Sequence, residues 1–454
     1  MSSTIAAIAT PKGKGGLGVI RISGPDAIAV AQGIFAAKSG KSLNKMAGYT
    51  ALYGHVFDEG GDIDEAVALI FRAPKSYTGE DVAELSCHGG EYNLARVLSA
   101  AYRAGAVPAA AGEFTKRAFL GGKLSLTEAE AVADIISADG EYSAKLSLAA
   151  HRGAIAAEID RVAQLLTAIS GSVAANIDFP EEDLAEMTRE EMATSAAEAL
   201  RSLDALLDSF SVGQQIRSGI PAVIIGAPNV GKSSLMNFLC RRERSIVSDI
   251  PGTTRDIVET HINIAGVTLI VADTAGIRDT DNPIEKIGVQ KALEKIPESG
   301  IIFCVLDGSM PLSDAEAELL LSCPIGRTIM VINKTDLPQL LNVRYILEKY
   351  IHIVYISAIN GDGFDGIESA VRNLLDLQKL DENAAVLANG RQYSCAARAR
   401  DGVAELHRAL TSGETFDIVG VLLDEALDNL LELTGGKASQ AVIDEIFSHF
   451  CVGK

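Results

Sequence analysis

The stretch Gly226-Ala227-Pro228-Asn229-Val230-Gly231-Lys232-Ser233 decides the fold of the middle of this 454-residue chain. It matches the phosphate-binding pattern G-x-x-x-x-G-K-[ST]. The apolar run 221–225 before it predicts a buried strand, and residues 234–239, starting with Ser234, predict a helix. A strand, a glycine-rich turn and a helix surround phosphates with backbone N–H groups, Lys232 reaches the outer phosphates, and Ser233 holds Mg²⁺. The stretch therefore predicts a nucleoside triphosphate site.

Three further motifs predict the base and the reaction. Asp336 in Asn333-Lys334-Thr335-Asp336 offers a carboxylate to N1–H and the 2-amino group of guanine, a donor pair that adenine lacks. Ser357-Ala358-Ile359 follows the run 353–356 and supports the base from its edge. Asp273-Thr274-Ala275-Gly276 ends the run 267–272 and suits an outer-shell Mg²⁺ role and close approach to the γ-phosphate. The four motifs in this order predict a Ras-like GTPase.

The residues that neutralise charge in the transition state are not identified by these motifs. Ras-like enzymes place a water-orienting Gln after the D-x-x-G motif, but Ile277 stands there. Arg255 is either an arginine finger or a solvated loop charge. A partner's arginine or a bound monovalent cation would serve the same purpose.

Composition limits the class of protein. The net charge of −20 argues against a general nucleic-acid binder, so RNA contact requires a local basic patch or a second protein. Six cysteines without C-x-x-C spacing favour a reducing cytosol and no zinc site. The N-terminus lacks signal-peptide features, and no apolar run is long enough to span a bilayer. We therefore expect a cytoplasmic protein that does not enter the membrane.

The periodicity predicts a multidomain α/β chain. Strands are expected at 5–9, 17–22, 66–71 and 82–86, with a hairpin loop at 11–16 and a capping box at Thr127 and Glu130. Helical stripes are expected at 155–173 and at Val419, Leu422, Ala426, Leu430 and Leu433, the latter ended by Gly435-Gly436. We assign an α+β domain to 1–123, helical halves to 124–216 and 377–454, and an inserted GTPase domain with a mostly parallel sheet to 217–376.

With these segments assembled, the chain resembles the tRNA wobble-uridine modification GTPases, called MnmE or TrmE, over its whole length. The resemblance rests on Ala9-Thr10-Pro11, Gly15 to Gly24, Ser76 to Asp81, Cys87-His88-Gly89-Gly90, Gly112 to Leu120, Gly252-Thr253-Thr254-Arg255-Asp256 and the end Phe450-Cys451-Val452-Gly453-Lys454. Ala111, Lys12 and Gly121 depart from the family pattern in the N-terminal domain.

The resemblance implies the following residue roles in the GTPase domain. Glu285 is the catalytic acid that acts through water. Ser233 and Thr254 bind Mg²⁺, and Asn229, Ser248, Ile250 and Thr253 bind K⁺. Asp249, Pro251 and Gly252 belong to the same GTP-binding loop.

The resemblance also implies a folate site. Arg21, Glu84, Lys123 and Lys454 match the positions that bind a tetrahydrofolate derivative, either 5-formyl- or 5,10-methylene-tetrahydrofolate. Cys451 is either a reactive thiolate near Lys454 or a small packing residue of the tail.

The implied protein is a homodimer. With an FAD- and NADH-dependent partner of the MnmG (GidA) type, in a heterotetramer, it adds aminomethyl or carboxymethylaminomethyl groups to C5 of the wobble uridine of tRNA. A ribosome-assembly or regulatory RNA-binding GTPase is the alternative, although such proteins typically add a basic domain. A folate-binding switch protein is a third hypothesis.

Overall fold

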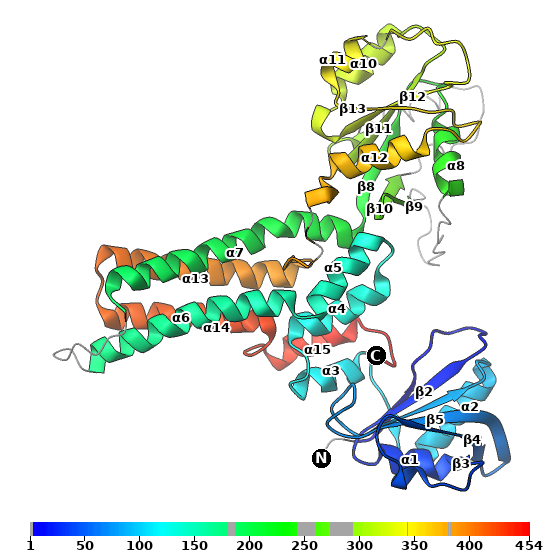
Figure 1. The fold of residues 1–454 in the computed structure, drawn as a ribbon, viewed down its shortest axis with the longest axis vertical. Helices are drawn as coiled ribbons and strands as arrows, with labels where there is room; N and C mark the ends of the chain where they lie inside the picture. Colours follow the sequence, from blue (N-terminus) through cyan, green and yellow to red (C-terminus); the bar gives the residue numbers. More distant parts are fainter. Residues whose placement is uncertain are drawn as a thin grey trace. The chain divides into compact units, whose positions relative to one another are not determined.

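A computed structural model describes residues 3–178, 187–242, 259–272, 294–342, 344–379, 381 and 383–454. The chain divides into two compact units. The first consists of 1–133, 150–204 and 394–454, and the second of 134–149 and 205–393 (Figure 1). Each unit is therefore built from segments that are distant in the sequence. The domain boundaries assigned from the sequence stay predictions.

The N-terminal part of the first unit is a mixed sheet with two helices on one face and a third helix packed against part of the other. Its strands are ordered β3-β4-β5-β6-β2-β1-β7, and every pair is antiparallel except β1 with β7. The elements are β1 (Ile5–Ile8), β2 (Gly18–Ser23), α1 (Ala27–Ile34), β3 (Phe35–Ala37), the 3-10 helix η1 (Leu43–Lys45), β4 (Thr50–Asp58), β5 (Gly61–Phe71), β6 (Val82–Cys87), α2 (Glu91–Arg103), β7 (Val107–Pro108) and α3 (Glu113–Leu120).

Alternation along the strands decides which side chains lie under α1 and α2. Ile20, Ile22 and Leu85 point to the core that α1 and α2 complete with Ile28 and Val97. Because neighbouring residues on a strand point to opposite faces, Arg21 and Glu84 lie on the other face of the sheet. The predicted hairpin around residues 11–16 is confirmed by the antiparallel pairing of β1 with β2.

Long helices from both ends of the chain form the rest of the first unit. The elements are α4 (Leu126–Ser137), α6 (Ala154–Asp178), α7 (Arg189–Ser218), α13 (Gly390–Ser412), α14 (Phe416–Thr434) and α15 (Gln440–Ser448), with α4, α7 and α13 continuing into the second unit. The helix α6 packs on α14, and Arg400 of α13 pairs with Asp204 of α7 at 2.9 Å. The two helical halves thus meet although the GTPase segment separates them, which confirms the predicted insertion (Figure 1).

The predicted helical stripes are confirmed, except that one buried position in α14 lies one residue later than predicted. The predicted position of the capping box is wrong. Leu423 is buried in α14, whereas the predicted Leu422 is only partly covered. The box that starts α4 is Ser125 with Glu128, because Ser125 N donates to Glu128 Oε2 at 2.5 Å and Glu128 N donates to Ser125 Oγ at 3.2 Å. Thr127 and Glu130 have the same spacing but are buried inside the helix. The pattern alone does not select between two overlapping boxes.

The second unit contains the predicted GTPase sheet. Its described strands are ordered β13-β12-β11-β8-β10-β9, and only the β9–β10 pair is antiparallel. The elements are α5 (Glu141–His151, of which His151 lies in the first unit), β8 (Ile220–Ile225), α8 (Lys232–Arg242), β9 (Glu259–Ile264), β10 (Val267–Ala272), β11 (Ile301–Asp307), α10 (Asp314–Ser322), the 3-10 helix η2 (Ile325–Arg327), β12 (Thr328–Asn333), α11 (Arg344–Lys349), β13 (His352–Tyr355), α12 (Phe364–Leu374) and the 3-10 helix η3 (Leu377–Lys379).

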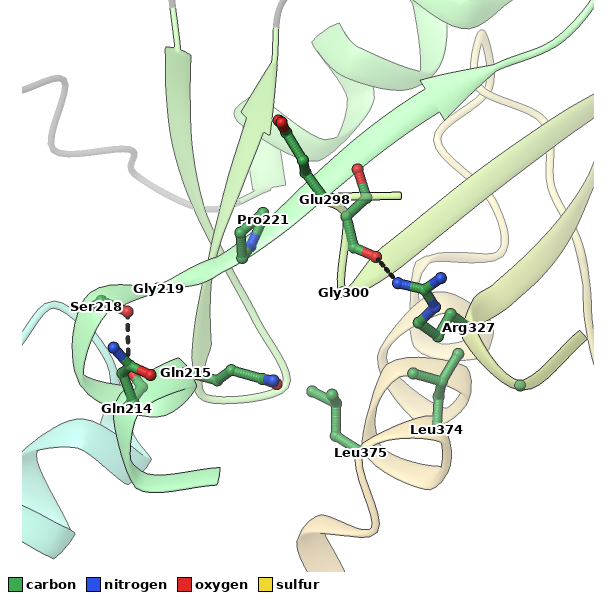
Figure 2. Close-up of a pocket in the computed structure, with 12 residues that line it drawn as sticks. Gln214, Gln215, Ser218, Gly219, Pro221, Glu298, Gly300, Arg327, Leu374 and Leu375 are labelled. Carbon is green, nitrogen blue, oxygen red and sulfur yellow. Dashed lines mark hydrogen bonds between the residues drawn. The ribbon is translucent and has the colours of Figure 1, made fainter. Parts of the chain in front are cut away.

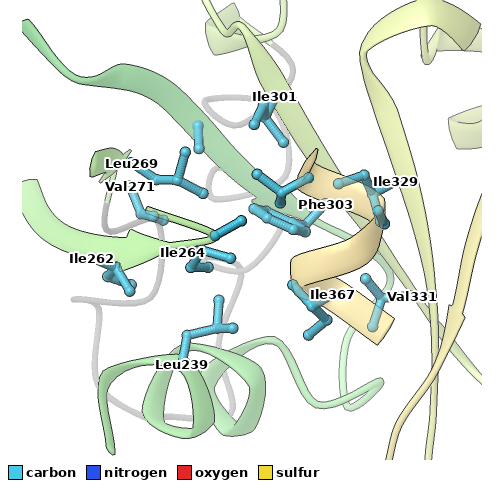
Figure 3. Close-up of a cluster of buried hydrophobic side chains, with 14 of the residues drawn as sticks. Leu239, Ile262, Ile264, Leu269, Val271, Ile301, Phe303, Ile329, Val331 and Ile367 are labelled. Atoms are coloured by element: carbon cyan, nitrogen blue, oxygen red, sulfur yellow. The ribbon is translucent and has the colours of Figure 1, made fainter. Parts of the chain in front are cut away.

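Apolar side chains on both faces of this sheet are buried. On one face, Phe303 of β11 packs in a cluster with Leu239 of α8 and Ile367 of α12 (Figure 3). On the other face, Cys304 and Met330 pack in a cluster with Leu320 of α10. Because both faces are covered, the central strands are apolar throughout, as is typical of parallel sheets.

Phe303→Ala tests this core. The ring is fully buried, so its removal leaves a cavity and should lower the free energy of unfolding by about 3–5 kcal/mol. Urea unfolding followed by circular dichroism measures the change. Ile351→Ala is the control, because Ile351 is 82% exposed and its truncation should change the free energy by less than about 0.5 kcal/mol. Equal effects of the two substitutions would contradict the burial of Phe303.

Candidate functional site

The phosphate loop connects β8 to α8 and depends on backbone angles that favour glycine. Gly226 has φ +155° and Gly231 has φ +100°. A Cβ on Gly226 would lie 2.5 Å from Val305 O, and one on Gly231 would lie 2.2 Å from Nδ2 of Asn333. Asn229 is left-handed as well, with φ +61°, a region in which asparagine is enriched. The two glycines let the loop pass close to β11 and to Asn333.

Lys232 and Ser233 begin α8. Nζ of Lys232 donates to the carbonyl oxygens of Gly226 at 3.0 Å and Ala227 at 2.7 Å, so the ammonium group lies across the loop. Ser233 is exposed in the first helical turn. Val230 is buried against the sheet, and Ser234 is partly buried in the same turn. The arrangement places a cation and a hydroxyl at the start of a helix, where backbone N–H groups favour anions.

Asn333 joins the phosphate loop to the predicted base loops. Its side chain is buried, Nδ2 donates to Val230 O at 2.9 Å, and Oδ1 accepts from Ala358 N at 3.1 Å. One amide therefore holds three segments together, although Val230 precedes Asn333 by 103 positions and Ala358 follows it by 25.

Asp336 and Ser357 are also brought together. Ser357 Oγ donates to Asp336 Oδ1 at 2.6 Å, and Thr335 N donates to Ile356 O at 3.1 Å. Ser357 is buried, whereas Asp336 and Ile359 are exposed. The carboxylate of Asp336 is thus fixed in place while remaining accessible, as the recognition of a guanine edge requires.

Asp307, which the sequence analysis missed, forms an ion pair with Lys334 of the motif Asn333-Lys334-Thr335-Asp336. Its Oδ2 lies 2.6 Å from Nζ of Lys334, and its Oδ1 accepts from Ser309 N at 2.9 Å and Ser309 Oγ at 2.6 Å. Burial raises the pKa of Asp307, but the hydrogen bonds from Lys334 and Ser309 outweigh burial and hold the pKa below its ordinary value. Its place at the end of β11, beside the end of β12, was the signal that could have found it.

Other predicted residues lie outside the described residues. They are Ser248, Asp249, Ile250, Pro251, Gly252, Thr253, Thr254, Arg255, Asp273, Thr274, Ala275, Gly276, Ile277 and Glu285. Within the described part of the chain, no three His, Cys, Asp or Glu side chains cluster as metal ligands. Of the predicted Mg²⁺ and K⁺ ligands, Ser233 and Asn229 are described. Their hydroxyl and amide oxygens are suitable donors for hard cations.

A second group of predicted residues meets on the opposite face of the N-terminal sheet, where Phe114 of α3 packs with Ile5 and Ala7 of β1. Arg21 and Glu84 are register partners on β2 and β6, and Arg21 Nε lies 2.8 Å from Glu84 Oε1. The guanidinium group lies 5.7 Å from the ring centre of Tyr77 and 5.6 Å from that of Phe114. Glu84 Oε2 accepts no hydrogen bond from the residues that the structure describes. The site thus combines a planar cation, the partly exposed ring of Tyr77 and an available carboxylate oxygen, and the fully buried ring of Phe114 supports the cation.

The C-terminal tail completes this group. Arg21 Nη1 donates to Gly453 O at 3.1 Å, and Phe114 N donates to Lys454 O at 3.2 Å. Val452 forms an antiparallel bridge with Ala111, one of the positions that departs from the family pattern. Burial lowers the pKa of Lys454, the Arg21 charge lowers it further, and Glu84 opposes both. Cys451 is exposed, so it is not a buried packing residue.

Lys123 is bound to the loop that precedes Tyr77. Its Nζ donates to Pro74 O at 3.2 Å and to Ser76 O. Tyr77 in turn hydrogen-bonds Thr115 at 2.9 Å, and burial raises its pKa. Tyr77 and Phe114 were not predicted as site residues, although both lie inside the quoted motifs.

A cavity of about 520 Å³ lies elsewhere in the GTPase unit (Figure 2). Pro221, Gly300 and Arg327 line it where β8, β11 and β12 begin, with Gln215 of α7 and Leu375 beyond α12. Arg327 Nη1 donates to Ser299 O at 2.9 Å. The nucleotide motifs follow the opposite ends of the same parallel strands, so this cavity is not the nucleotide site.

Comparison with known proteins decides the family. The family profile of the MnmE helical domain matches residues 126–451, and that of the GTP-binding protein TrmE N-terminus matches residues 4–123. The tRNA modification GTPase MnmE of Symbiobacterium thermophilum is 42% identical over 99% of this chain and 99% of its own length. The chain belongs to the MnmE family of tRNA modification GTPases.

Another relative agrees with this MnmE membership. The tRNA modification GTPase MnmE of Geobacter metallireducens is 40% identical over 100% of both chains. The solved structure of a variant of Aquifex aeolicus Era bound to GDP·AlF4− is 26% identical, covers 40% of this chain and 66% of that one, and has a TM-score of 0.26. The MnmE assignment does not depend on this last similarity. Among the described residues, no helix has the length and apolarity to cross a membrane.

Asp307→Asn tests whether the acid positions Lys334. Loss of the charge should release the lysine and weaken GDP binding by about tenfold, the effect of one charge-assisted hydrogen bond. Calorimetry measures the dissociation constant. If Asp307 acts through Lys334, Asp307→Asn should add nothing in a Lys334→Met background.

Asp365→Asn is the matched control, because Asp365 is exposed in the first turn of α12. It should leave GDP binding unchanged. Additive losses in the Asp307 and Lys334 double variant would mean that the two residues act independently.

Proposed function

We propose that this protein hydrolyses GTP to drive modification of the wobble uridine of tRNA. The observation that carries the proposal is the joining of the phosphate loop, the Asn333 motif and Ser357-Ala358 by one buried amide, in a chain that matches the MnmE family from end to end. The modification adds an aminomethyl or carboxymethylaminomethyl group at C5, with an FAD- and NADH-dependent protein of the MnmG type as partner. We further propose a cytoplasmic homodimer that forms a heterotetramer with this partner.

The geometry of the described residues supports the nucleotide roles that we propose. Lys232 and the N-terminus of α8 would meet the outer phosphates, and Asp336, held by Ser357, would accept from the guanine edge. Ser233 would hold Mg²⁺ and Asn229 would contribute to a K⁺ site, together with Thr254, Ser248, Ile250 and Thr253 outside the described residues. Bound cations would offset the charge that develops on the phosphates. Glu285 is proposed to orient the attacking water, and Arg255 remains a candidate for charge neutralisation.

The residues around Arg21 and Glu84, on the face of the N-terminal sheet opposite α1 and α2, support a tetrahydrofolate site. A pterin is flat and carries adjacent N–H donors, which suit the partly exposed ring of Tyr77 and the carboxylate of Glu84, while the fully buried ring of Phe114 packs beside Arg21. Arg21 would hold Glu84 in position and Lys454 would complete the site beside both, while Lys123 fixes the loop that carries Tyr77. The folate would supply the one-carbon unit.

A ribosome-assembly GTPase is the alternative function. It would bind GTP through the same motifs but would not need folate or the C-terminal tail. The contacts of Gly453 and Lys454 with Arg21 and Phe114 favour the tRNA-modification function, because they connect the last residues of the chain to the proposed folate site.

Exchange of Na⁺ for K⁺ at constant ionic strength tests the proposed cation. GTP turnover should rise by roughly 10²-fold, a typical effect of one oriented charge-stabilising group. Asn229→Ala should remove most of this response while GDP binding changes little. Equal turnover in both salts, measured by phosphate release, would contradict the proposed K⁺ site.

Gly453→Ala tests the tail and its link to tRNA modification. Gly453 has φ +100°, and a Cβ there would lie 2.4 Å from Ile8 O, so the substitution should displace the tail from Arg21. Binding of 5-formyltetrahydrofolate, measured by calorimetry, should weaken by at least about tenfold because a charged contact and the local backbone are both lost. Mass spectrometry of wobble uridines in a complemented deletion strain should show the unmodified base. GTP binding should be unchanged.

Gly171→Ala is the control for this substitution, because a Cβ at Gly171 in α6 would meet nothing within 4 Å. Normal folate binding and normal tRNA modification by Gly453→Ala would overturn the proposed tail site. Loss of tRNA modification with normal folate binding would instead mean that the tail acts in a step of the modification other than folate binding.

A further inference from the structure

The first 57 residues are positively charged in a chain that is otherwise acidic. They contain six lysine or arginine residues and one carboxylate, Asp26, whereas the whole chain has a net charge of −20. Residues 27–57 contain no Asp or Glu. Charges more than about 8 Å apart are largely screened in physiological salt, so a local surface can attract an anion despite the acidic total.

The fold gathers three of these lysines at the edge of the N-terminal sheet. Lys38 and Lys41 flank the turn after β3, the outermost strand, where Gly40 has φ +70° and its N–H donates to Ala37 O at 2.9 Å. Lys45 ends η1. All three are exposed, and none forms an ion pair with a residue that the structure describes. Together with Tyr49 and Tyr53, they are called the basic edge.

The two tyrosines add exposed rings to the lysines. Nζ of Lys38 lies 5.3 Å from the ring centre of Tyr53, and Glu65 bounds the basic edge on the side of the Tyr53 hydroxyl. Tyr49 is 64% exposed and has φ +60°, which is uncommon for a bulky residue. Its N–H donates to Ile70 O at 2.7 Å, and its ring meets Phe71 edge-on at 5.6 Å. Backbone strain that the surroundings maintain is often associated with function.

Hydrogen bonds fix the loop that runs from Asn44 to Tyr49. The guanidinium group of Arg72 donates to Asn44 O at 2.8 Å and to Met46 O at 3.3 Å, and it pairs with Asp81 at 3.0 Å. The loop is therefore held at several points. A partner that binds there would not have to order it first.

We propose that the basic edge binds the RNA substrate, with its lysines on phosphates and the ring of Tyr49 stacked on an unpaired base. Phosphate contacts give RNA binding most of its affinity, and unpaired bases stack on exposed aromatic side chains. An acidic protein would use the lysines but would not require the exposed, strained ring of Tyr49. The inference rests on the proposed tRNA substrate and does not depend on the folate site.

Lys41→Glu/Lys45→Glu tests the phosphate contacts in the full-length protein. Affinity for a fluorescent unmodified tRNA transcript, measured by anisotropy, should fall by about tenfold or more. The slope of the logarithm of the binding constant against the logarithm of the salt concentration should become less steep by roughly 0.7 to 0.9 for each lost phosphate contact. Lys12→Glu/Lys14→Glu is the matched control. It changes the net charge equally in an exposed loop at the other end of the same sheet and should change affinity less than about twofold.

Tyr49→Ala and Tyr49→Phe test the stacking contact. The alanine variant should weaken binding of the anticodon stem-loop by at least about fivefold, and the phenylalanine variant should retain it because the ring is kept. A fully paired RNA hairpin should bind all three proteins equally. GTP turnover without RNA, thermal unfolding and 5-formyltetrahydrofolate binding should match those of the parent protein, which separates this inference from the folate proposal.

Equal losses in the two double lysine variants would overturn the proposal, because they would show that only net charge matters. Unchanged RNA binding by Lys41→Glu/Lys45→Glu would also overturn it. If that variant nevertheless lost tRNA modification in cells, the basic edge would serve a protein partner instead.

Discussion

The side-chain amide of Asn333 is the interaction on which the nucleotide loops depend. Its N–H group donates to Val230 O, its oxygen accepts from Ala358 N, and the side chain is 3% exposed. Leaving either partner buried and unsatisfied would cost about 1–3 kcal/mol. Gly231 is required beside it, because a Cβ would occupy the position of the amide. Contacts within the protein therefore fix the position of the phosphate loop relative to the base loops.

Insertion of the GTPase segment imposes a second constraint on the chain. The helices α6 and α7 precede that segment and α13 and α14 follow it, so the bundle forms only when both halves meet. Phe447 and Phe450 then pack with Leu126, which brings the last residues to Ala111 and Arg21. The N-terminal site thus depends on residues from both ends of the chain, and changes in the bundle will affect it.

Local patterns predicted much of this structure, and long-range contacts explain the rest. The strand Val267–Ala272, the stripe of α6 and the residues around Lys232 follow from periodicity and motif spacing, which are properties of neighbouring residues. Asp307 was missed because its role depends on Lys334, which becomes its neighbour only when β11 pairs with β12. Tyr77 and Phe114 were missed because their rings meet Arg21 only after three segments have come together.

Charged residues in this protein fall into two classes. Partly buried ion pairs hold the side chains of the two candidate sites in position, whereas exposed lysines are available to a binding partner. The pairs Arg21–Glu84 and Lys334–Asp307 are partly buried, with side-chain exposures of 11% to 28%. Burial makes such pairs costly, so they contribute orientation more than stability. The lysines of the basic edge are solvated and unpaired within the described structure, and they stabilise the fold little. Their local charge, rather than the net charge of −20, determines how a polyanion approaches this surface.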